Sequence, residues 1–294
     1  MVLGDCSLAE QSHAGAILVP HDPTISSLQN PTVKNLVKLR RRRERDAQQC
    51  FLIDGTRPLY IALGVGWPLD TIYCTPTAAR GHDNLLAQAR AHGIRLQTVT
   101  DVVFQKIGYG DHPDGLLGLA RQPDLSLRRL PRPAVPLYMI TQGLEKPGNL
   151  GAILRSADAA GVTGVIVCDN QIDLWNPNVV RASQGACFTV PLATASALEI
   201  LQWLHHQNIQ LLAAAPTANQ LYTQVNLCLP TAMVVGAEHA GLSTAWLHST
   251  CVRIPMAGRV DSLNVAQAAS ILLFEAVRQR QELQITATLE SRVY

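Results

Sequence analysis

The sequence predicts an α/β protein with a mostly parallel C-terminal sheet, helices on both faces of that sheet, and a smaller α/β unit before it. From Leu137 onward, short apolar segments alternate with amphipathic ones, which is typical of parallel strands joined by helices. Proline recurs between residues 123 and 136, as in a semi-rigid linker. The 294 residues, 47% of them hydrophobic, suffice for about two domains with separate cores.

The N-terminal part begins without a helical or strand period, so we expect an irregular lead-in. A helix is predicted from Asn30, which can cap it, with Pro31 in its first turn. A small α/β unit follows, whose apolar strands are expected at residues 51–53, 71–74, 96–99 and 116–120. The predicted division of the chain is 1–24 lead-in, 25–125 N-terminal domain, 126–135 linker and 136–294 C-terminal domain.

The C-terminal part predicts strands at residues 137–141, 162–168, 188–191, 209–215, 232–235 and 253–254. Helices are expected between them, at 150–160, 176–185 and 196–207, and after them at 262–280. Ser196 and Glu199 form a capping box, and Ser262 is the expected N-cap of the last helix.

Composition limits the possible functions. A net charge of +2 produces no global field toward nucleic acid, so any basic surface must be local. Seven scattered cysteines without a Cys-x-x-Cys pair indicate buried thiols in a reducing compartment rather than a disulfide frame or zinc site. No apolar run reaches ~18 residues and the first residues do not resemble a signal peptide. We expect a cytoplasmic protein without metal or membrane partners.

The helix predicted after Asn30 is strongly basic. Seven cations fall within residues 34–45 of an otherwise nearly neutral chain, and Lys34, Lys38, Arg41 and Arg45 share one helical face. This face is either a solvated charged surface or a surface that binds phosphates, and the local density of charge favours the second.

Three loops that follow apolar strands combine glycines with small polar and charged side chains: 146–155, 236–242 and 254–264. Because the carboxyl ends of parallel strands share one edge of a sheet, we expect these loops to converge on a ligand site. Metal-ligand clusters, phosphate loops and serine nucleophile elbows are absent from the sequence, which argues against metal hydrolysis, nucleotide hydrolysis and serine acyl transfer. Taken singly, each loop also fits an ordinary crossover.

Together the loops resemble the three signature motifs of the SpoU (TrmH-like) branch of the SPOUT methyltransferases. The matching positions are Asn149, Gly151 and Arg155; Gly236, Glu238, Gly241 and Leu242; and Ile254, Pro255, Met256, Gly258 and Ser262 to Val265. Residues 25–122 resemble the RNA-binding domain that often precedes this fold. Lys146 departs from the pattern, because an Asp-Pro pair commonly precedes the asparagine in the family.

The resemblance implies a deep C-terminal trefoil knot, a homodimer formed through the knotted domain, and S-adenosylmethionine as cofactor. By the resemblance, the cofactor would contact Ala213, Ala214, Ala215, Gly236, Glu238, Ile254, Met256, Leu263 and Asn264. The implied reaction is methyl transfer to a ribose 2′-hydroxyl of RNA.

The implied catalytic residues are Arg155, Asn149, Glu238, Ser262 and Asn264. Family proposals use the matched arginine as a base, but a guanidinium stays protonated, so we interpret Arg155 as binding RNA phosphate and stabilising alkoxide charge. Glu238 would orient Arg155, and the other three would fix substrate and loop geometry. On spacing alone, Glu238 could equally form a salt bridge within its loop, and Asn264 could equally form a hydrogen bond at the start of the helix.

Ribosomal RNA is the favoured substrate, because a separate N-terminal domain and a basic helix suit a large RNA. The alternatives are a tRNA ribose methyltransferase, or an rRNA methyltransferase that confers antibiotic resistance. A different class also remains open, namely a non-catalytic RNA-binding or assembly protein that has the same fold.

Overall fold

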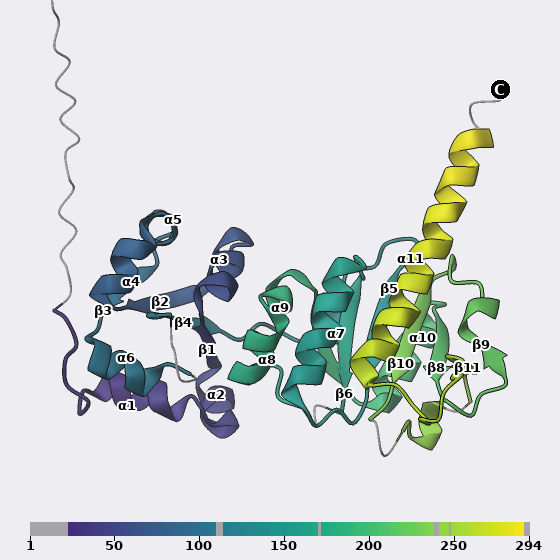
Figure 1. Ribbon diagram of the computed structural model, residues 1–294, viewed down its shortest axis with the longest axis horizontal. Helices are drawn as coiled ribbons and strands as arrows, with labels where there is room; N and C mark the ends of the chain where they lie inside the picture. Colours follow the sequence, from purple (N-terminus) through teal and green to yellow (C-terminus); the bar gives the residue numbers. More distant parts are fainter. Residues whose placement is uncertain (1–22, 110–113, 170–171, 238–240, 247, 291–294) are drawn as a thin grey trace, which may run out of the picture.

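The structure is a computed structural model, and it describes residues 23–109, 114–169, 172–237, 241–246 and 248–290, with side chains described as far as Ile285. Figure 1 shows an elongated molecule with two lobes side by side, each built on its own sheet. The first lobe contains residues 23–121 and the second residues 137–290. Within the described ranges, no helix has the length and apolar character needed to cross a membrane.

The N-terminal lobe is a four-stranded mixed sheet with helices on both faces. Its strands are β1 (Cys50–Asp54), β2 (Leu69–Cys74), β3 (Arg95–Thr98) and β4 (Leu116–Arg121). They lie in the order β1-β4-β2-β3, with β4 antiparallel to both neighbours and β2 parallel to β3. The helices are α1 (Pro31–Lys38), α2 (Arg42–Gln48), α3 (Thr56–Gly64), α4 (Pro76–Gly81), α5 (Asp83–Ala91) and α6 (Asp101–Ile107).

The C-terminal lobe is a seven-stranded sheet in the order β7-β6-β5-β10-β8-β11-β9, and every neighbouring pair is parallel. Its strands are β5 (Leu137–Thr141), β6 (Gly164–Cys168), β7 (Leu192–Ala195), β8 (Gln210–Ala214), β9 (Gln220–Leu221), β10 (Thr231–Val235) and β11 (Thr250–Arg253). Its helices are α7 (Pro147–Ala159), α8 (Pro177–Ser183), α9 (Ala186–Thr189), α10 (Ala197–His206) and α11 (Val265–Glu290), with 3-10 turns at Tyr222–Gln224 and Thr244–Trp246. A further 3-10 turn, Leu127–Arg129, lies in the segment between the lobes.

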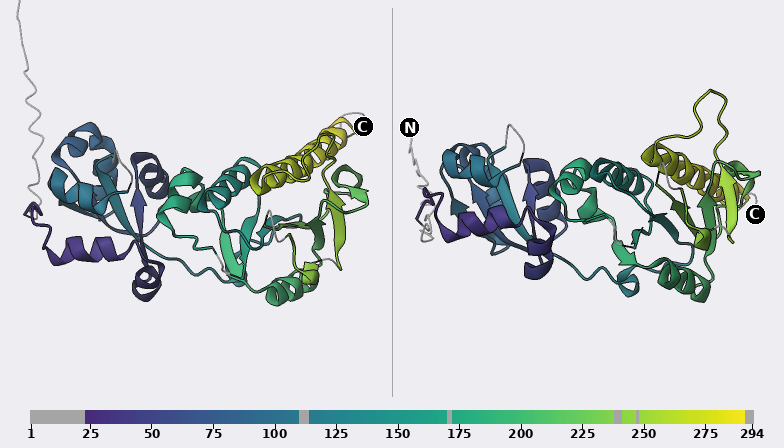
Figure 2. Two further views of the ribbon diagram at one scale, coloured as in Figure 1. Left: turned by 60° about the horizontal axis from the view of Figure 1, so that its bottom comes forward. Right: turned by 90° about the horizontal axis from the view of Figure 1, so that it is seen from below.

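Both faces of the C-terminal sheet are buried, which explains why its strands are apolar throughout. Alternate side chains such as Met139 and Met233 pack with α7 and α11, whereas Ile140 and Val234 pack with α10 on the other face. Figure 2 shows α7 and α11 on one side of the sheet and α10 on the other. This confirms the predicted parallel α/β class.

The strand predicted at 188–191 is wrong, because residues 186–189 form α9 and the strand β7 begins only at Leu192. Gln184 and Gly185 both have positive φ and start a new turn. The ring of Phe188 then packs into an aromatic cluster with Phe51 and Trp67, a tertiary contact that overrides the local strand preference.

The predicted continuous basic helix is also wrong, because it breaks between α1 and α2. The break buries Leu39 and directs the guanidinium of Arg40 to the carbonyl oxygens of Lys106 and Gly108, at 2.9 and 2.6 Å. The second helix is rotated relative to the first as a result, and its residues no longer continue the same face.

A buried aromatic and ionic interface joins the two lobes. Phe51 of β1 stacks on Trp175 with ring centroids 4.3 Å apart, and Trp67 meets Phe188 at 5.1 Å. Arg45 of α2 pairs with Asp173, and the side chain of Arg45 is only 2% exposed. The position of the N-terminal lobe is therefore fixed by packing and not by the linker alone.

Candidate active site

A pocket lies at the carboxyl edge of the parallel sheet, where β10, β8 and β11 end side by side. It encloses about 700 Å³ of space between protein atoms, part of which is open solvent. The lining residues are Ala214, Ala215, Pro216, Val235, Gly236, Ala237, Gly241, Val252, Arg253, Ile254, Met256, Asp261, Ser262, Leu263, Val265 and Ala268. The second and third motif loops do converge, as expected of loops that follow neighbouring parallel strands.

Glycine is required at Gly236 by close packing of the backbone. A Cβ atom there would lie 2.4 Å from the carbonyl oxygen of Gly241, which is too close for any side chain. The turn after β10 therefore brings backbone groups to the pocket without a side chain between them.

Most of the cofactor contacts implied by the family motifs line this pocket, as the positions of Ala214, Ala215, Gly236, Ile254, Met256 and Leu263 show. Ala213 and Asn264 do not line the pocket. Ala213 is fully buried in β8, and its neighbour Ala214 reaches the pocket instead. Glu238 lies outside the described residues. Arg253 and Asp261 line the pocket and were missed, although their place inside the third motif segment could have pointed to them.

Asn149 and Asn264 connect the first and third motifs. The amide nitrogen of Asn264 donates a hydrogen bond to the side-chain oxygen of Asn149 at 3.1 Å. The side-chain oxygen of Asn264 also accepts from the backbone N–H of Ala266 at 3.0 Å. Asn264 is therefore the N-cap of α11, and the prediction that Ser262 caps this helix is wrong because α11 begins only at Val265.

Arg155 does not reach this pocket within one chain. It lies on α7 six residues after Asn149, a separation that places the two side chains about 120° apart around the helix. Instead it lines a second recess between the lobes, with Arg57, Ile61, Asp158, Ser183, Gln184, Gly185, Ala186 and Thr189. The structure thus brings Asn149 and Asn264 together and places Arg155 elsewhere.

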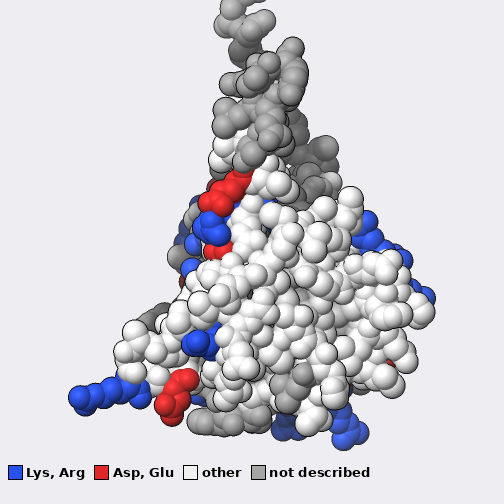
Figure 3. All heavy atoms as spheres, turned by 90° about the vertical axis from the view of Figure 1, so that its right-hand side faces the viewer, with Lys and Arg blue, Asp and Glu red and all other residues white. Residues whose placement is uncertain are grey.

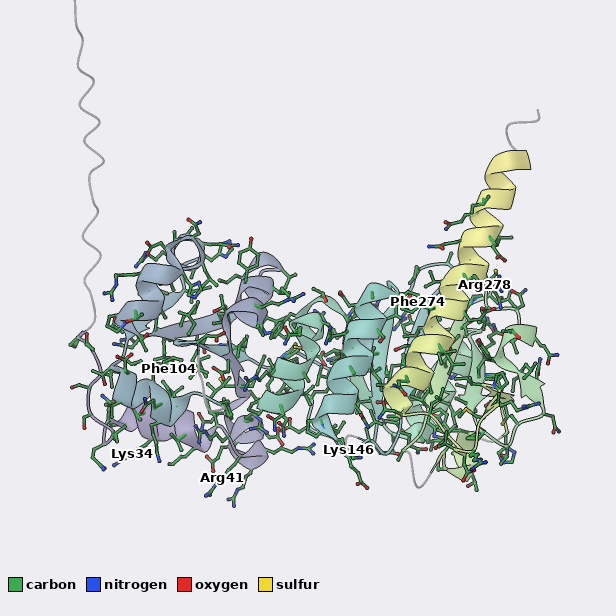
Figure 4. All side chains as sticks on the ribbon, viewed as in Figure 1. Lys34, Arg41, Phe104, Lys146, Phe274 and Arg278 are labelled. Carbon is green, nitrogen blue, oxygen red and sulfur yellow. The ribbon has the colours of Figure 1, made fainter. Side chains whose placement is uncertain are left out.

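The predicted RNA-binding residues of the basic helix divide into two groups. Lys34, Lys38 and Arg41 are exposed, and Figure 4 shows Lys34, Arg41 and the motif residue Lys146 along the same lower edge of the molecule. Arg45 is buried: it donates to the carbonyl oxygen of Leu39 at 2.6 Å and pairs with Asp173. The prediction that Arg45 contacts RNA is wrong, since its charge is already compensated inside the protein.

The parallel sheet, its apolar edge pocket and the glycine-containing loops define a cofactor-binding α/β domain preceded by a separate lobe. The family comparison gives the particular class: the model of the SpoU rRNA methylase family matches residues 136–274, and that of the MRM3-like substrate binding domain matches residues 30–118. The chain belongs to the SpoU rRNA methylase family.

Related proteins resemble the chain over most of their length. It is 32% identical over 240 residues to the 23S rRNA (uridine(2479)-2′-O)-methyltransferase of Streptomyces viridochromogenes, covering 78% of this chain and 83% of that protein. It is 42% identical to a solved RNA 2′-O ribose methyltransferase, covering 88% of this chain and 100% of that one with a TM-score of 0.75. An AdoMet-bound rRNA methyltransferase from Sinorhizobium meliloti gives a TM-score of 0.80 at 31% identity, with 87% and 97% covered.

Proposed function

We propose that this protein transfers a methyl group from S-adenosylmethionine to a ribose 2′-hydroxyl of ribosomal RNA. The observation that carries the proposal is the pocket at the ends of β10, β8 and β11, whose lining coincides with the cofactor positions of the family motifs. The relative from Streptomyces acts on 23S rRNA by its name, which favours rRNA over tRNA.

The residues of the pocket fit the cofactor. Its apolar surfaces from Ala214, Val235 and Leu263 suit an adenine ring, and the close backbone at Gly236 leaves peptide groups available for the ribose. When bound, S-adenosylmethionine supplies a methyl group already activated by a sulfonium, so no covalent nucleophile is required. Within the described residues, His, Cys, Asp and Glu side chains form no group that could hold a metal ion.

The protein's own task is to position the acceptor ribose and stabilise its oxygen. Arg155 binds the neighbouring phosphate and stabilises the developing negative charge. Its guanidinium does not accept the hydroxyl proton, which is released to solvent water as the oxygen takes the methyl group and the sulfonium becomes a neutral thioether. The hydrogen bond between Asn149 and Asn264 holds the first turn of α7 against the start of α11, which fixes the edge of the pocket near the substrate. Ser262 lines the pocket, and Glu238 is proposed to orient the Arg155 that completes the site.

Because Arg155 and the pocket are separate within one chain, we propose a homodimer in which the partner subunit's Arg155 completes each site. Residues 200–237 contain no Lys, Arg, Asp or Glu, and Figure 3 shows a large surface of the C-terminal lobe with few charges. Phe274 on α11 is 48% exposed and Val260 in the third loop is 66% exposed. The C-terminal lobe thus has both a sparsely charged surface and exposed apolar side chains, and each supports self-association through this lobe.

We also propose the deep knot and the domain division at residues 126–135. The strand order supports the knot: β11 is last in the sequence but lies between β8 and β9, which residues 215–219 connect. The short connection from β8 to β9 therefore passes across the inserted parallel strand β11, an arrangement compatible with a threaded path, which is rare in proteins.

Methylation of rRNA from cells that lack the gene tests the proposal, with labelled S-adenosylmethionine and primer-extension mapping of the product. We expect one ribose to be methylated, and Arg155→Ala to lower kcat by ~100-fold or more while calorimetry shows unchanged cofactor affinity. Absence of cofactor binding by the wild type would favour a non-catalytic RNA-binding scaffold instead. Methylation of tRNA alone would overturn the choice of substrate.

A further inference from the structure

Two recesses on the upper side of the molecule share one residue, Arg57 of α3. The first is the recess between the lobes that contains Arg155. The second lies within the N-terminal lobe and is lined by Thr56, Arg57, Tyr60, Arg80, Gly81, His82, Asp83, Asn84, Leu85 and Asp114. Figure 1 places α3, α4 and α5 along the upper edge, opposite the basic helices α1 and α2. A continuous surface therefore leads from Arg155 across α3 to α4.

Three guanidinium groups on this surface have no partner in the part of the chain that the structure describes. Arg57, Arg80 and Arg155 are exposed, and none forms a hydrogen bond or ion pair with another described residue. In contrast, Arg40 and Arg45 of the basic segment are both bound to protein groups. Unpaired arginines beside concave surfaces are the groups with which proteins bind phosphates.

The carboxylates on the same surface do not neutralise these arginines. Asp158 accepts a hydrogen bond from the hydroxyl of Thr189, and Asp114 accepts one from the backbone N–H of Thr56 at 3.2 Å. Asp83 lies in the first turn of α5, where the helix dipole favours a negative charge. Each carboxylate therefore has a local structural role, while the arginines remain available.

An aromatic side chain lines the same recess as Arg57 and Arg80. Tyr60 is 61% exposed and lies three residues after Arg57, on the same face of α3. A tyrosine ring beside arginines is suited to stack an unpaired base while the cations hold its phosphates.

The distance between this surface and Arg155 is fixed by packing. Ile61 of α3 fits against Gly185, where an added Cβ atom would lie 2.5 Å from the terminal carbon of Ile61. The aromatic stack of Phe51 on Trp175 and the ion pair of Arg45 with Asp173 lie in the same interface. RNA bound by Arg155 therefore lies within reach of Arg57 without any movement of the lobes.

We propose that Arg57, Tyr60 and Arg80 form a binding track for single-stranded RNA beside Arg155. Arg57 and Arg80 bind phosphates of nucleotides that flank the methylated one, and Tyr60 stacks a flanking base. The inference deepens the proposed function, on which it rests, and assigns substrate positioning to α3 and α4 rather than to the basic helix.

Binding of a fluorescent single-stranded RNA of mixed sequence and of the matching duplex tests the track. Arg57→Ala and Arg80→Ala are each expected to reduce the salt dependence of single-strand affinity by about one phosphate contact. Tyr60→Ala is expected to weaken it by ~10-fold, whereas Tyr60→Phe retains it. Arg90→Ala is the matched control, because Arg90 is an exposed arginine of α5 that lines neither recess.

The result that overturns the track is wild-type RNA affinity and salt dependence in all three alanine variants, with thermal melts that show intact folding. Stronger binding of duplex than of single strand would also contradict it. A different result would contradict the proposed function and leave the track intact: wild-type protein that binds the RNA through these residues but methylates no rRNA.

Discussion

The carboxyl group of Asp54 shows how a single buried residue can make stability depend on pH. One oxygen accepts a hydrogen bond from the backbone N–H of Tyr109 at 3.1 Å, and the other has no hydrogen-bond partner among the described residues. Burial raises the pKa of Asp54 from 3.8 to about 6, with Arg181, Asp114 and Arg40 as the neighbouring charges. The folded protein therefore binds a proton more tightly than the unfolded chain does between these two values.

Because this pKa is raised on folding, Asp54 lowers stability as pH rises from about 4 to about 6, and its effect is constant above that range. Asp54→Asn removes the titration, so the difference in unfolding free energy between variant and wild type should increase with pH over this window. Urea denaturation at several pH values measures it. A difference that does not change with pH would contradict the assignment.

The site residues could be predicted only in part, for physical reasons visible at Arg45. The convergence of the motif glycines and asparagines was predictable, because loops that follow parallel strands meet at the carboxyl edge of the sheet. The separation of Arg155 from the pocket was also predictable, because six residues along one helix place its side chain about 120° from that of Asn149. Burial of Arg45 depends on Asp173, a partner distant in sequence that local pattern cannot reveal.

At the scale of elements, the motif glycine Gly151 is explained by helix packing. A Cβ atom on Gly151 of α7 would lie 2.4 Å from Cβ of Ala182 and 2.8 Å from its backbone carbon, where α8 ends. The close contact holds α7, which carries both Asn149 and Arg155, against α8.

Gly151→Ala should therefore destabilise the protein by about 2 kcal/mol, because α7 and α8 must separate to admit the methyl group. Gly148→Ala on the same helix is the control: its Cβ meets nothing within 4 Å, and alanine favours helix by ~0.5 kcal/mol or more. Chemical denaturation compares them. Equal stability of the two variants would show that the contact is unimportant.

The elements themselves were well predicted where burial and capping agree. The apolar runs of β5, β6, β8 and β10 correspond to strands covered on both faces, and the capping box at Ser196 and Glu199 is present. The failures at 188–191 and at the break after α1 both follow from tertiary contacts, those of Phe188 and Arg40, which outweigh local preference.

At the scale of the whole molecule, the buried ion pair of Arg45 and Asp173 joins the lobes. Asp173→Ala leaves the guanidinium of Arg45 buried and uncompensated, so we expect a loss of ~3 kcal/mol in unfolding free energy. Asp46→Ala removes the exposed pair with Arg42 and should cost less than ~1 kcal/mol. Similar losses in urea denaturation would mean that the interface does not depend on the buried pair.

The central claim is that each methylation site combines the pocket of one subunit with the partner subunit's Arg155. Co-expression of two inactive chains, Arg155→Ala and the pocket-blocking Gly236→Val, tests it most directly. Mixed dimers then contain one intact site, so an equal mixture should recover about a quarter of wild-type rRNA methylation. Persistent inactivity of dimers shown to be mixed would contradict the account.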